Sequence, residues 1–429
     1  MANITLAQKM LIGGRRVPVP PTWIAALSGP TTSSDLAMAI ATDADGNHYI
    51  QGRLASSSPT KMCIAKYNSS GALQWQRELY QIDRAFANGI GVDSVGNVYV
   101  LGHGRDSGSY DHAIIAKYNS SGALQWQRKL SQTNKRFSSE GIAVSPSGDV
   151  AIVIANETDS PKSSTVAKYN NAGTLQWQRT VSHSTGVTLL GCAIDVSDNV
   201  YACGSFDGSS RSYGLLRKYN SSGALQAERR IYKTDSSGNY AVLRGVAVDG
   251  SGNIYLAAQM ATGSVAYATG IKLNSSFVIQ WDRHVTGSGA PSSWDGVAIS
   301  PDDGSVVFCG DGAAVQYLPD ASVQWQRNLI GETGDNLTAV SCTDDAVVFA
   351  ALMGFTASGN DMTTVKMLSG GGVLGMYGPM EWAELSFSST ALTLTIDTPT
   401  LTDSAGALTD AAGNAADAAG SLTPTLYEA

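Results

Sequence analysis

The sequence has few of the residues on which most enzyme sites depend. It holds five histidines and five cysteines in 429 residues. It contains no HExxH zinc motif, no GxSxG nucleophile elbow, no Walker phosphate loop and no Rossmann fingerprint. The cysteines form no CxxC pair and no cluster with histidine, so they are expected to be buried thiols, with a Cys192–Cys203 bridge across one hairpin as the alternative. We therefore expect no enzyme, no metal and no cofactor.

Basic charge and long apolar runs are also scarce. The chain carries 28 Lys and Arg against 36 Asp and Glu, a formal net charge of −8, without a basic stripe. Nucleic-acid binding is disfavoured because phosphate contacts need clustered cations. No stretch approaches the roughly 20 apolar residues of a membrane helix. The first apolar run is broken by Gln8, Lys9 and residues 13–16, so no Sec signal is expected and the chain is predicted to be made in the cytoplasm.

What the sequence has in abundance is a repeat. Residues 65–77 return letter for letter at residues 116–128. Weaker copies lie at residues 167–179, 217–229, 271–283 and 315–327, and a degraded one at 370–375. The two identical copies begin with Ala-Lys-Tyr, turn through Asn-Ser-Ser-Gly and end in Leu-Gln-Trp-Gln-Arg, and the weaker copies vary this pattern, with Ala227 in place of the tryptophan in one of them. The tryptophan alternates with glutamine as in a strand, and we interpret it as a residue that packs one repeat on the next.

A second element separates these copies and occurs seven times. It joins two short apolar runs through an Asp-x-x-Gly-Asn turn, as at residues 89–100. The aspartates of this turn (Asp43, Asp93, Asp195 and Asp249) are predicted to cap the turn rather than to bind Ca²⁺. Each unit of about 50 residues thus holds four β-like runs, which is the period of a propeller blade. The sequence predicts an all-β, seven-bladed β-propeller of four-stranded blades.

The two ends of the chain lie outside this pattern. Residues 1–22 form an N-terminal arm, residues 23–378 the propeller, and residues 379–429 a C-terminal β and low-complexity extension. The run that starts at Trp23 matches the tryptophan strand, so it is expected to complete the seventh blade, with the degraded copy at 370–378 as its rival. The arms cannot form a core of their own and are predicted to become ordered on a partner.

Three family resemblances follow from these motifs. The Gly-Ile-Ala-Val and Asp-x-x-Gly-Asn-x-Tyr-Val element resembles the bacterial SBBP β-propeller repeats. The Ser-Gly-Ala-Leu-Gln-Trp-Gln-Arg element resembles the tryptophan-docking repeat of quinoprotein and BamB-like propellers, although those are exported and typically eight-bladed, and this chain lacks the vicinal cysteines of quinoprotein dehydrogenases. In its repeats, its Gly/Ser/Thr/Ala richness and its arms, the whole chain is similar to virion proteins of tailed bacteriophages.

Candidate binding residues lie in the least repetitive segments, which connect the second and third strands of successive units. These segments are residues 102–111, 156–164, 206–211 and 260–268, and they are expected to cluster on one face of the ring. His103 and His112 flank the first of them, and we expect them to be a surface pair. The candidate residues are Arg105, Asp106, Tyr110, Asp111, Glu157, Asp159, Asp207 and Arg211.

The leading hypothesis is a non-enzymatic virion component, present in several copies and attached to a phage tail or tail tip through its arms. Its partners would be other tail proteins and a glycan or protein of the host surface. One alternative is a glycan- or protein-binding module secreted by a non-Sec route. Another is a polysaccharide lyase or glycosidase, which would require carboxylates or histidines that converge near the ring axis.

Overall fold

The computed structural model describes most of the chain between residues 35 and 368 and a series of short strands on either side. The described residues are 11–12, 15–16, 23–28, 35–54, 60–80, 84–105, 110–132, 134–208, 211–233, 240–263, 265–286, 290–330, 336–344, 346–356, 359–368, 375–377, 380–384, 388–390, 394–397, 402–405, 409–412, 416–419 and 423–428. The secondary structure within these ranges is all β. They include no helix that would cross a bilayer.

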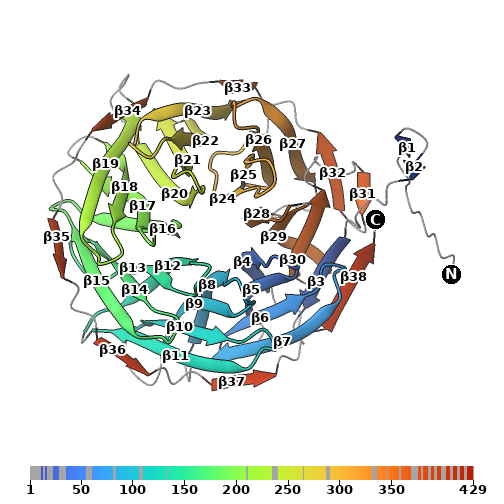
Figure 1. The fold of residues 1–429 in the computed structure, drawn as a ribbon, viewed down its shortest axis with the longest axis horizontal. Coiled ribbons are helices and arrows are strands. Elements are labelled where there is room, and N and C mark those ends of the chain that lie inside the picture. The colour runs from blue at the N-terminus through green and yellow to red at the C-terminus, as the bar shows by residue number, and fades with distance from the viewer. Residues whose placement is uncertain are drawn as a thin grey trace.

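Antiparallel sheets are arranged around a central opening as a β-propeller, with consecutive strands running outward from the centre (Figure 1). The first three sets are β4 (Leu36–Thr42), β5 (His48–Leu54), β6 (Lys61–Tyr67) and β7 (Leu73–Tyr80); β8 (Arg84–Val92), β9 (Val98–Arg105), β10 (His112–Tyr118) and β11 (Leu124–Ser131); and β12 (Phe137–Val144), β13 (Val150–Asn156), β14 (Ser163–Tyr169) and β15 (Leu175–Ser182).

The following sets repeat the same order. They are β16 (Val187–Ile194), β17 (Val200–Asp207), β18 (Ser212–Tyr219) and β19 (Leu225–Lys233); β20 (Tyr240–Val248), β21 (Ile254–Thr262), β22 (Val265–Leu273) and β23 (Ile279–Thr286); and β24 (Gly296–Ile299), β25 (Val306–Gly310), β26 (Ala313–Tyr317) and β27 (Val323–Ile330). A single parallel bridge between Ser212 and Tyr240 joins two of these sets into one sheet. A separate hairpin is formed by β1 (Leu11–Ile12) and β2 (Arg15–Arg16).

The last set combines the two ends of the repeat region. Strands β28 (Asn336–Cys342), β29 (Ala346–Thr356) and β30 (Gly359–Leu368) are followed on the outside by β3 (Trp23–Ser28). Trp23 pairs with Lys366 in the same register in which Trp75 pairs with Lys66. The N-terminal strand therefore pairs with β30 at this position, and its rival β31 (Gly375–Tyr377) pairs elsewhere, with β32 (Met380–Glu384).

The repeated aspartates build the turn that the sequence predicts. Asp195 Oδ1 accepts hydrogen bonds from the backbone N–H groups of Ser197 and Asn199, each at 2.9 Å, and Oδ2 accepts from the Asn199 side chain at 2.8 Å. The Tyr201 hydroxyl donates to the same carboxylate at 3.1 Å. The turns of Asp43, Asp93 and Asp249 have the same bonds. Turn capping is confirmed.

Three of the repeated tryptophans connect their set of strands to the next, as expected. Trp177 Nε1 donates to the Ser221 carbonyl in the following set at 2.9 Å. Gly223 lies against the indole with φ at 79°, and a Cβ atom there would come within 2.6 Å of the ring. Glycine suits this left-handed backbone and close approach best, although Phe277 and Ala321 adopt the same left-handed backbone at the equivalent positions of two later sets. Trp75 and Trp126 make the equivalent contacts.

The C-terminal extension runs around the outside of the ring (Figure 1). Its strands, here called the belt, are β32 (Met380–Glu384), β33 (Ser388–Thr390), β34 (Leu394–Asp397), β35 (Thr402–Ala405), β36 (Thr409–Ala412), β37 (Ala416–Ala419) and β38 (Thr423–Glu428). They pair antiparallel with β27, β23, β19, β15, β11, β7 and β3, respectively. The sequence interpretation did not foresee that this extension pairs with the ring of its own chain.

Candidate functional site

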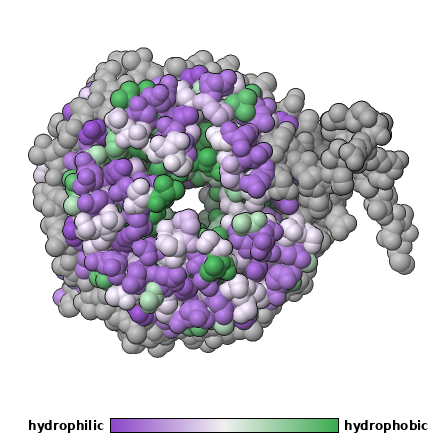
Figure 2. Space-filling view, in the orientation of Figure 1, coloured by the Kyte–Doolittle hydropathy of each residue, from purple (hydrophilic) through white to green (hydrophobic). Residues whose placement is uncertain are grey.

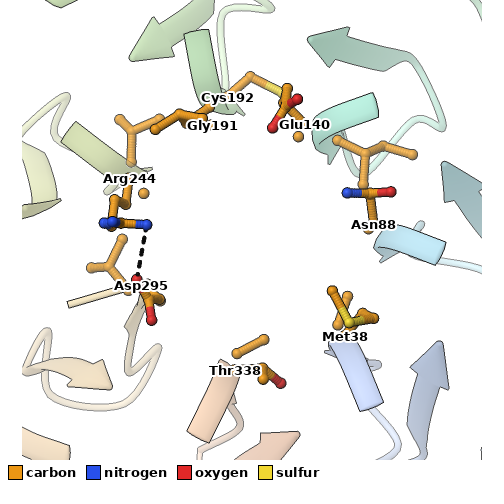
Figure 3. Close-up of a pocket in the computed structure, with 18 of the residues that line it drawn as sticks. Met38, Asn88, Glu140, Gly191, Cys192, Arg244, Asp295 and Thr338 are labelled. Carbon is orange, nitrogen blue, oxygen red and sulfur yellow. Dashed lines mark ion pairs between the residues drawn. The ribbon is translucent and has the colours of Figure 1, made fainter. Parts of the chain in front are cut away.

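The central opening holds a cavity of about 270 Å³ whose wall is made by the innermost strand of every set (Figures 2 and 3). Six of the inner segments contribute three consecutive residues to the wall, and β4 contributes two. The first residue of each segment differs from strand to strand. These residues are Met38, Asn88, Glu140, Leu190, Arg244, Asp295 and Thr338.

A β-bulge places most of these residues. The pairing register between the first and second strands shifts across Asn88, Glu140 and Arg244, so none of them has a partner in the ladder. Met38, Leu190 and Thr338 are skipped in the same way. A bulge re-aims the side chain of the extra residue, and Figure 3 shows Asn88, Glu140 and Arg244 around the opening.

Small residues follow the bulges because the inner strands approach one another closely. A Cβ atom on Gly141 would come within 2.9 Å of the Gly191 Cα atom, and one on Gly191 within 2.9 Å of the Arg244 carbonyl oxygen. Any larger residue would push the strands apart. The repeated glycine thus sets the width of the opening, and the residue before it sets the chemistry of the wall.

Arg244 and Asp295 form the charged side of the channel. Arg244 Nη1 lies 3.5 Å from Asp295 Oδ1, and Nη2 donates to Gln259 Oε1 at 3.2 Å. The buried Nε of Arg244 has no hydrogen-bond partner. Burial raises the pKa of the Asp295 carboxyl, an effect that Arg244 opposes and Asp311 reinforces. A buried donor without a partner is costly, so this wall favours a ligand that brings an acceptor.

Hydrogen bonds link Glu140 on the channel wall to Glu157, which lies in the loop between β13 and β14. The Ser138 hydroxyl lies 2.5 Å from Glu140 Oε1 and 3.1 Å from Glu157 Oε1, and its single hydrogen serves one of them at a time. Burial raises the pKa of Glu140, and the charge of Glu157 adds to this shift. Burial would also raise the pKa of Glu157, but hydrogen bonds from Lys162 and Ser138 outweigh it and lower that pKa. Lys162 Nζ lies 2.7 Å from Glu157 Oε2.

Asn88, another polar residue of the wall, is held by the neighbouring strand β12. The Ser139 hydroxyl donates to Asn88 Oδ1 at 2.7 Å and lies 3.1 Å from His103 Nδ1. His103 pairs with Ala113, so His103 and His112 point to opposite faces of their sheet and do not converge. The expectation of a histidine pair is wrong.

The predicted loop residues lie mostly in ion pairs with one another and with the connections between sets. Asp111 is paired with Arg105 at 3.2 Å and with Arg136 at 3.5 Å. Asp159 accepts from Asn156 and Ser163, each at 2.6 Å, and is also paired with Lys135. Tyr110 is 40% exposed, and Asp106 lies outside the described residues.

The fourth-set loop lies beside an aromatic cluster. Asp207 accepts from the Ser212 hydroxyl, and Arg211 donates to the Lys233 carbonyl at 2.9 Å. The Phe206 and Tyr213 rings stack at 5.2 Å, and the Tyr213 and Tyr232 rings meet edge to face at 5.1 Å. The Arg230 guanidinium lies 4.9 Å from the Tyr213 ring centre.

One further sequence-based expectation is wrong, and one alternative is excluded. Residues 260–268 are not a loop, because Met260 pairs with Tyr267 and the strands continue to Thr262 and from Val265. All five cysteines are free, so the Cys192–Cys203 bridge is absent. Strand pairing that extends past the repeated pattern accounts for the error.

Sequence reasoning missed the channel residues. A signal was present, since the position immediately before the first glycine or alanine of the Asp-turn element varies between copies that otherwise agree. No group of three or more His, Cys, Asp or Glu in the described ranges could hold a metal ion. The channel wall offers the guanidinium of Arg244, the amide of Asn88 and the carboxyls of Glu140 and Asp295, whose pKa values are raised. These groups suit hydrogen bonding to a polar group of a ligand.

Comparisons with known proteins return structures only. No family model matches the sequence, and no curated protein matches it. A crystal structure of Chaetomium thermophilum Sqt1 bound to the N-terminus of the ribosomal protein L10 has a TM-score of 0.46 at 13% identity, covering 80% of this chain and 98% of that one. The β-propeller domain of Myceliophthora thermophila Cps50 (Swd1) has a TM-score of 0.49 at 8% identity, covering 79% and 99%. These similarities carry over nothing about what this chain binds.

Proposed function

We propose that this protein is a non-enzymatic binding propeller of seven four-stranded blades, closed by β3, which docks a protein partner on its loop face. The observation that carries this proposal is the channel mouth, where Arg244 keeps a buried donor without a partner next to Asp295. An acceptor group of the partner, a carbonyl or carboxylate, would complete the hydrogen bonding of Arg244.

The surroundings of the channel support a protein partner rather than a small molecule. Glu140 is linked through Ser138 to Glu157, and this link supports a shared surface that joins the channel mouth to the loop between β13 and β14. That face carries charges of both signs, the exposed Tyr110 and the Tyr213–Tyr232–Arg230 cluster. Tyrosine and arginine are the residues that dominate many protein interfaces. The eight candidate loop residues are proposed to contribute to this surface.

A finer proposal concerns the biological setting. The near-identical repeats, the small-residue composition and the terminal extensions support a component of a phage tail or tail tip, with its loop face turned toward a tail protein or the host surface. Mass spectrometry of purified virions tests this assignment. Stoichiometric presence in the particle would support it, and recovery only from the culture medium would favour a secreted binding module.

Glu140 and Asp295 give one observation in favour of a polysaccharide-active enzyme, since both carboxyls lie on the channel wall and both pKa values are raised. A raised pKa is a property of many catalytic acids. The carboxylates nearest to them are already engaged, because Glu157 is paired with Lys162 and Asp311 accepts a hydrogen bond from Ser292, so binding is the better-supported function. Activity of the full chain on polysaccharides, lost in both Glu140→Gln and Asp295→Asn, would reverse this ranking.

Affinity capture with the tagged full-length chain tests the docking proposal. Partners recovered by the wild type, by Arg244→Gln and by Val196→Ser are quantified by mass spectrometry. Val196 is the matched control because it is 79% exposed in an Asp-turn, at the opposite ends of the strands. We expect a specific partner to fall about tenfold with Arg244→Gln, equivalent to about 1.4 kcal/mol, and not with Val196→Ser. Equal recovery by all three chains would contradict the proposal.

A further inference from the structure

The belt pairs with the ring in one constant register. Asp403, Asp410 and Asp417 pair with Val181, Leu130 and Leu79, which hold the same position in successive outer strands. The remaining belt strands continue the series. The full set of pairs is Trp382 with Leu329, Ser389 with Val285, Ile396 with Ile231, Asp403 with Val181, Asp410 with Leu130, Asp417 with Leu79 and Pro424 with Leu27.

These belt positions follow one another at steps of seven residues, one step for each set of strands. The sequence shows the same period independently of the pairing. Leu-Thr-Asp recurs at residues 401–403 and 408–410, Ala-Ala-Asp follows at 415–417, and glycine occupies positions 406, 413 and 420. Because the sequence period equals the number of belt residues per set of strands, we infer that the belt is a seven-residue repeat. Each unit of this repeat pairs with one set of strands of the ring.

The number of belt residues between one outer strand of the ring and the next is constrained by geometry. Seven extended residues span at most about 25 Å, so each unit must supply both a strand and the crossing to the next blade. If the belt slipped by one residue along the ring, each belt side chain would point to the opposite face of the sheet. The belt also covers backbone groups of the outer strands that would otherwise form unpaired edges, which are sites for strand addition.

We propose that the rim of the ring is a spacing-specific strand-binding interface whose ligand is the belt, and that a released rim accepts the belt of a second copy of this chain. Recognition by strand addition depends on main-chain hydrogen bonds, with side chains contributing selectivity. This suits a belt rich in Ala, Thr, Ser and Asp. Seven weak pairings on one segment act together through a high effective concentration.

A cleavable full-length chain provides the main test. A protease site is inserted between Gly370 and Gly371, in the Gly-rich link that follows β30. After cleavage, native mass spectrometry should show the fragment that starts at Gly371 still bound. A labelled synthetic peptide of residues 371–429 should replace it over hours in moderate urea. Loss of the fragment on cleavage, or no incorporation of label, would overturn the proposal.

A spacing-altered peptide is the matched control. It has the same sequence with one extra glycine after each of Gly406, Gly413 and Gly420, so its composition is almost unchanged while its period becomes eight in that stretch. We expect it to compete at least tenfold less well than the native peptide. Equal competition would show that the rim does not read spacing and would overturn that part of the proposal.

Hydrogen exchange in the intact chain keeps the proposal testable without cleavage. Replacement of both Asp410 and Ala411 by proline removes two consecutive N–H groups of β36, one of which faces β11. Amides of β11 should then exchange at least tenfold faster, and those of β15, which pairs with β35, should change much less. The control Asn414→Pro lies between β36 and β37. Unchanged exchange in β11 would contradict the docking of the belt.

Discussion

The strands differ between the end that carries the Asp-turns, here called the turn end, and the end that carries the loops between second and third strands, here called the loop end. At the turn end, Asp195 and its counterparts repeat the same hydrogen bonds, and Trp75, Trp126 and Trp177 each pack on the turn of the next set. Farther from the turns, the inner strands carry different residues before the repeated glycine or alanine, from Met38 to Thr338, and all of these except Asp295 lie at a bulge. Uniform contacts suit a scaffold, and non-uniform ones suit recognition. We therefore expect stability and the proposed binding to be separated along the strands, so that substitutions in the two regions affect different measurements.

Removal of a turn-end tryptophan is the strongest way to test this separation. Trp177→Ala would leave a cavity beside Gly223 and break the hydrogen bond to Ser221, and we expect a loss of about 3–5 kcal/mol in the free energy of unfolding. Gln176→Ala, on the exposed alternate face of the same strand, should change it by less than about 0.5 kcal/mol. Urea unfolding of the full chain gives both values. Similar losses in both variants would remove the structural role of the tryptophan.

Loss of a capping aspartate should be the next largest effect. Asp195→Ala leaves the N–H groups of Ser197 and Asn199 without their acceptor, at an expected cost of about 1–2 kcal/mol at pH 7. Burial would raise the pKa of Asp195, but hydrogen bonds from Asn199, Ser197 and Tyr201 outweigh it and lower that pKa. The stabilisation is therefore present above the unfolded-state pKa of about 3.9 and is lost as the pH falls through the folded-state value.

Asp195→Asn separates the charge of this residue from its shape. Its stability relative to the wild type should be lowest at neutral pH and should approach the wild-type value in acid. Urea unfolding between pH 3 and pH 7 measures this. A difference that does not depend on pH would mean that the charge of Asp195 contributes nothing to the turn.

For Glu140 on the channel wall, the dependence of stability on pH should have the opposite sign to that of Asp195. Burial and the charge of Glu157 raise the pKa of Glu140, so its ionisation costs stability as the pH rises from the unfolded-state pKa of about 4.3 to the folded-state value. Glu140→Gln should therefore stabilise the chain at pH 7 by less than about 1 kcal/mol and change little in acid. Thermal unfolding at the two pH values is sufficient. Destabilisation at pH 7 would assign Glu140 to the scaffold instead.

The sequence was most informative where contacts are local and repeated. The Asp-turns could be predicted because an aspartate that bonds backbone groups two and four residues later needs no distant partner. The tryptophan contacts were predictable because they recur, and the outer position of Trp23 because its run matches the other tryptophan strands.

The rest depends on which elements meet in space. Arg244 and Asp295 lie 51 positions apart, and their ion pair forms only because adjacent innermost strands approach at the channel. The belt escaped notice because Ala, Asp and Gly have low β propensity, and only the edges of the ring make strands of them. The seven-residue period is visible in the sequence, but only the structure shows that each unit pairs with one set of strands of the ring.

Hydroxyl-radical footprinting of the full chain, alone and in the complex captured from its natural assembly, tests the separation of scaffold and recognition most directly. We expect assembly to protect Tyr110, Tyr213 and Tyr232 at the loop end, while Val95 and Val196 at the turn end remain as reactive as in the free chain. Protection of the two valines, with the tyrosines unchanged, would contradict it and would place the binding surface on the opposite face of the ring.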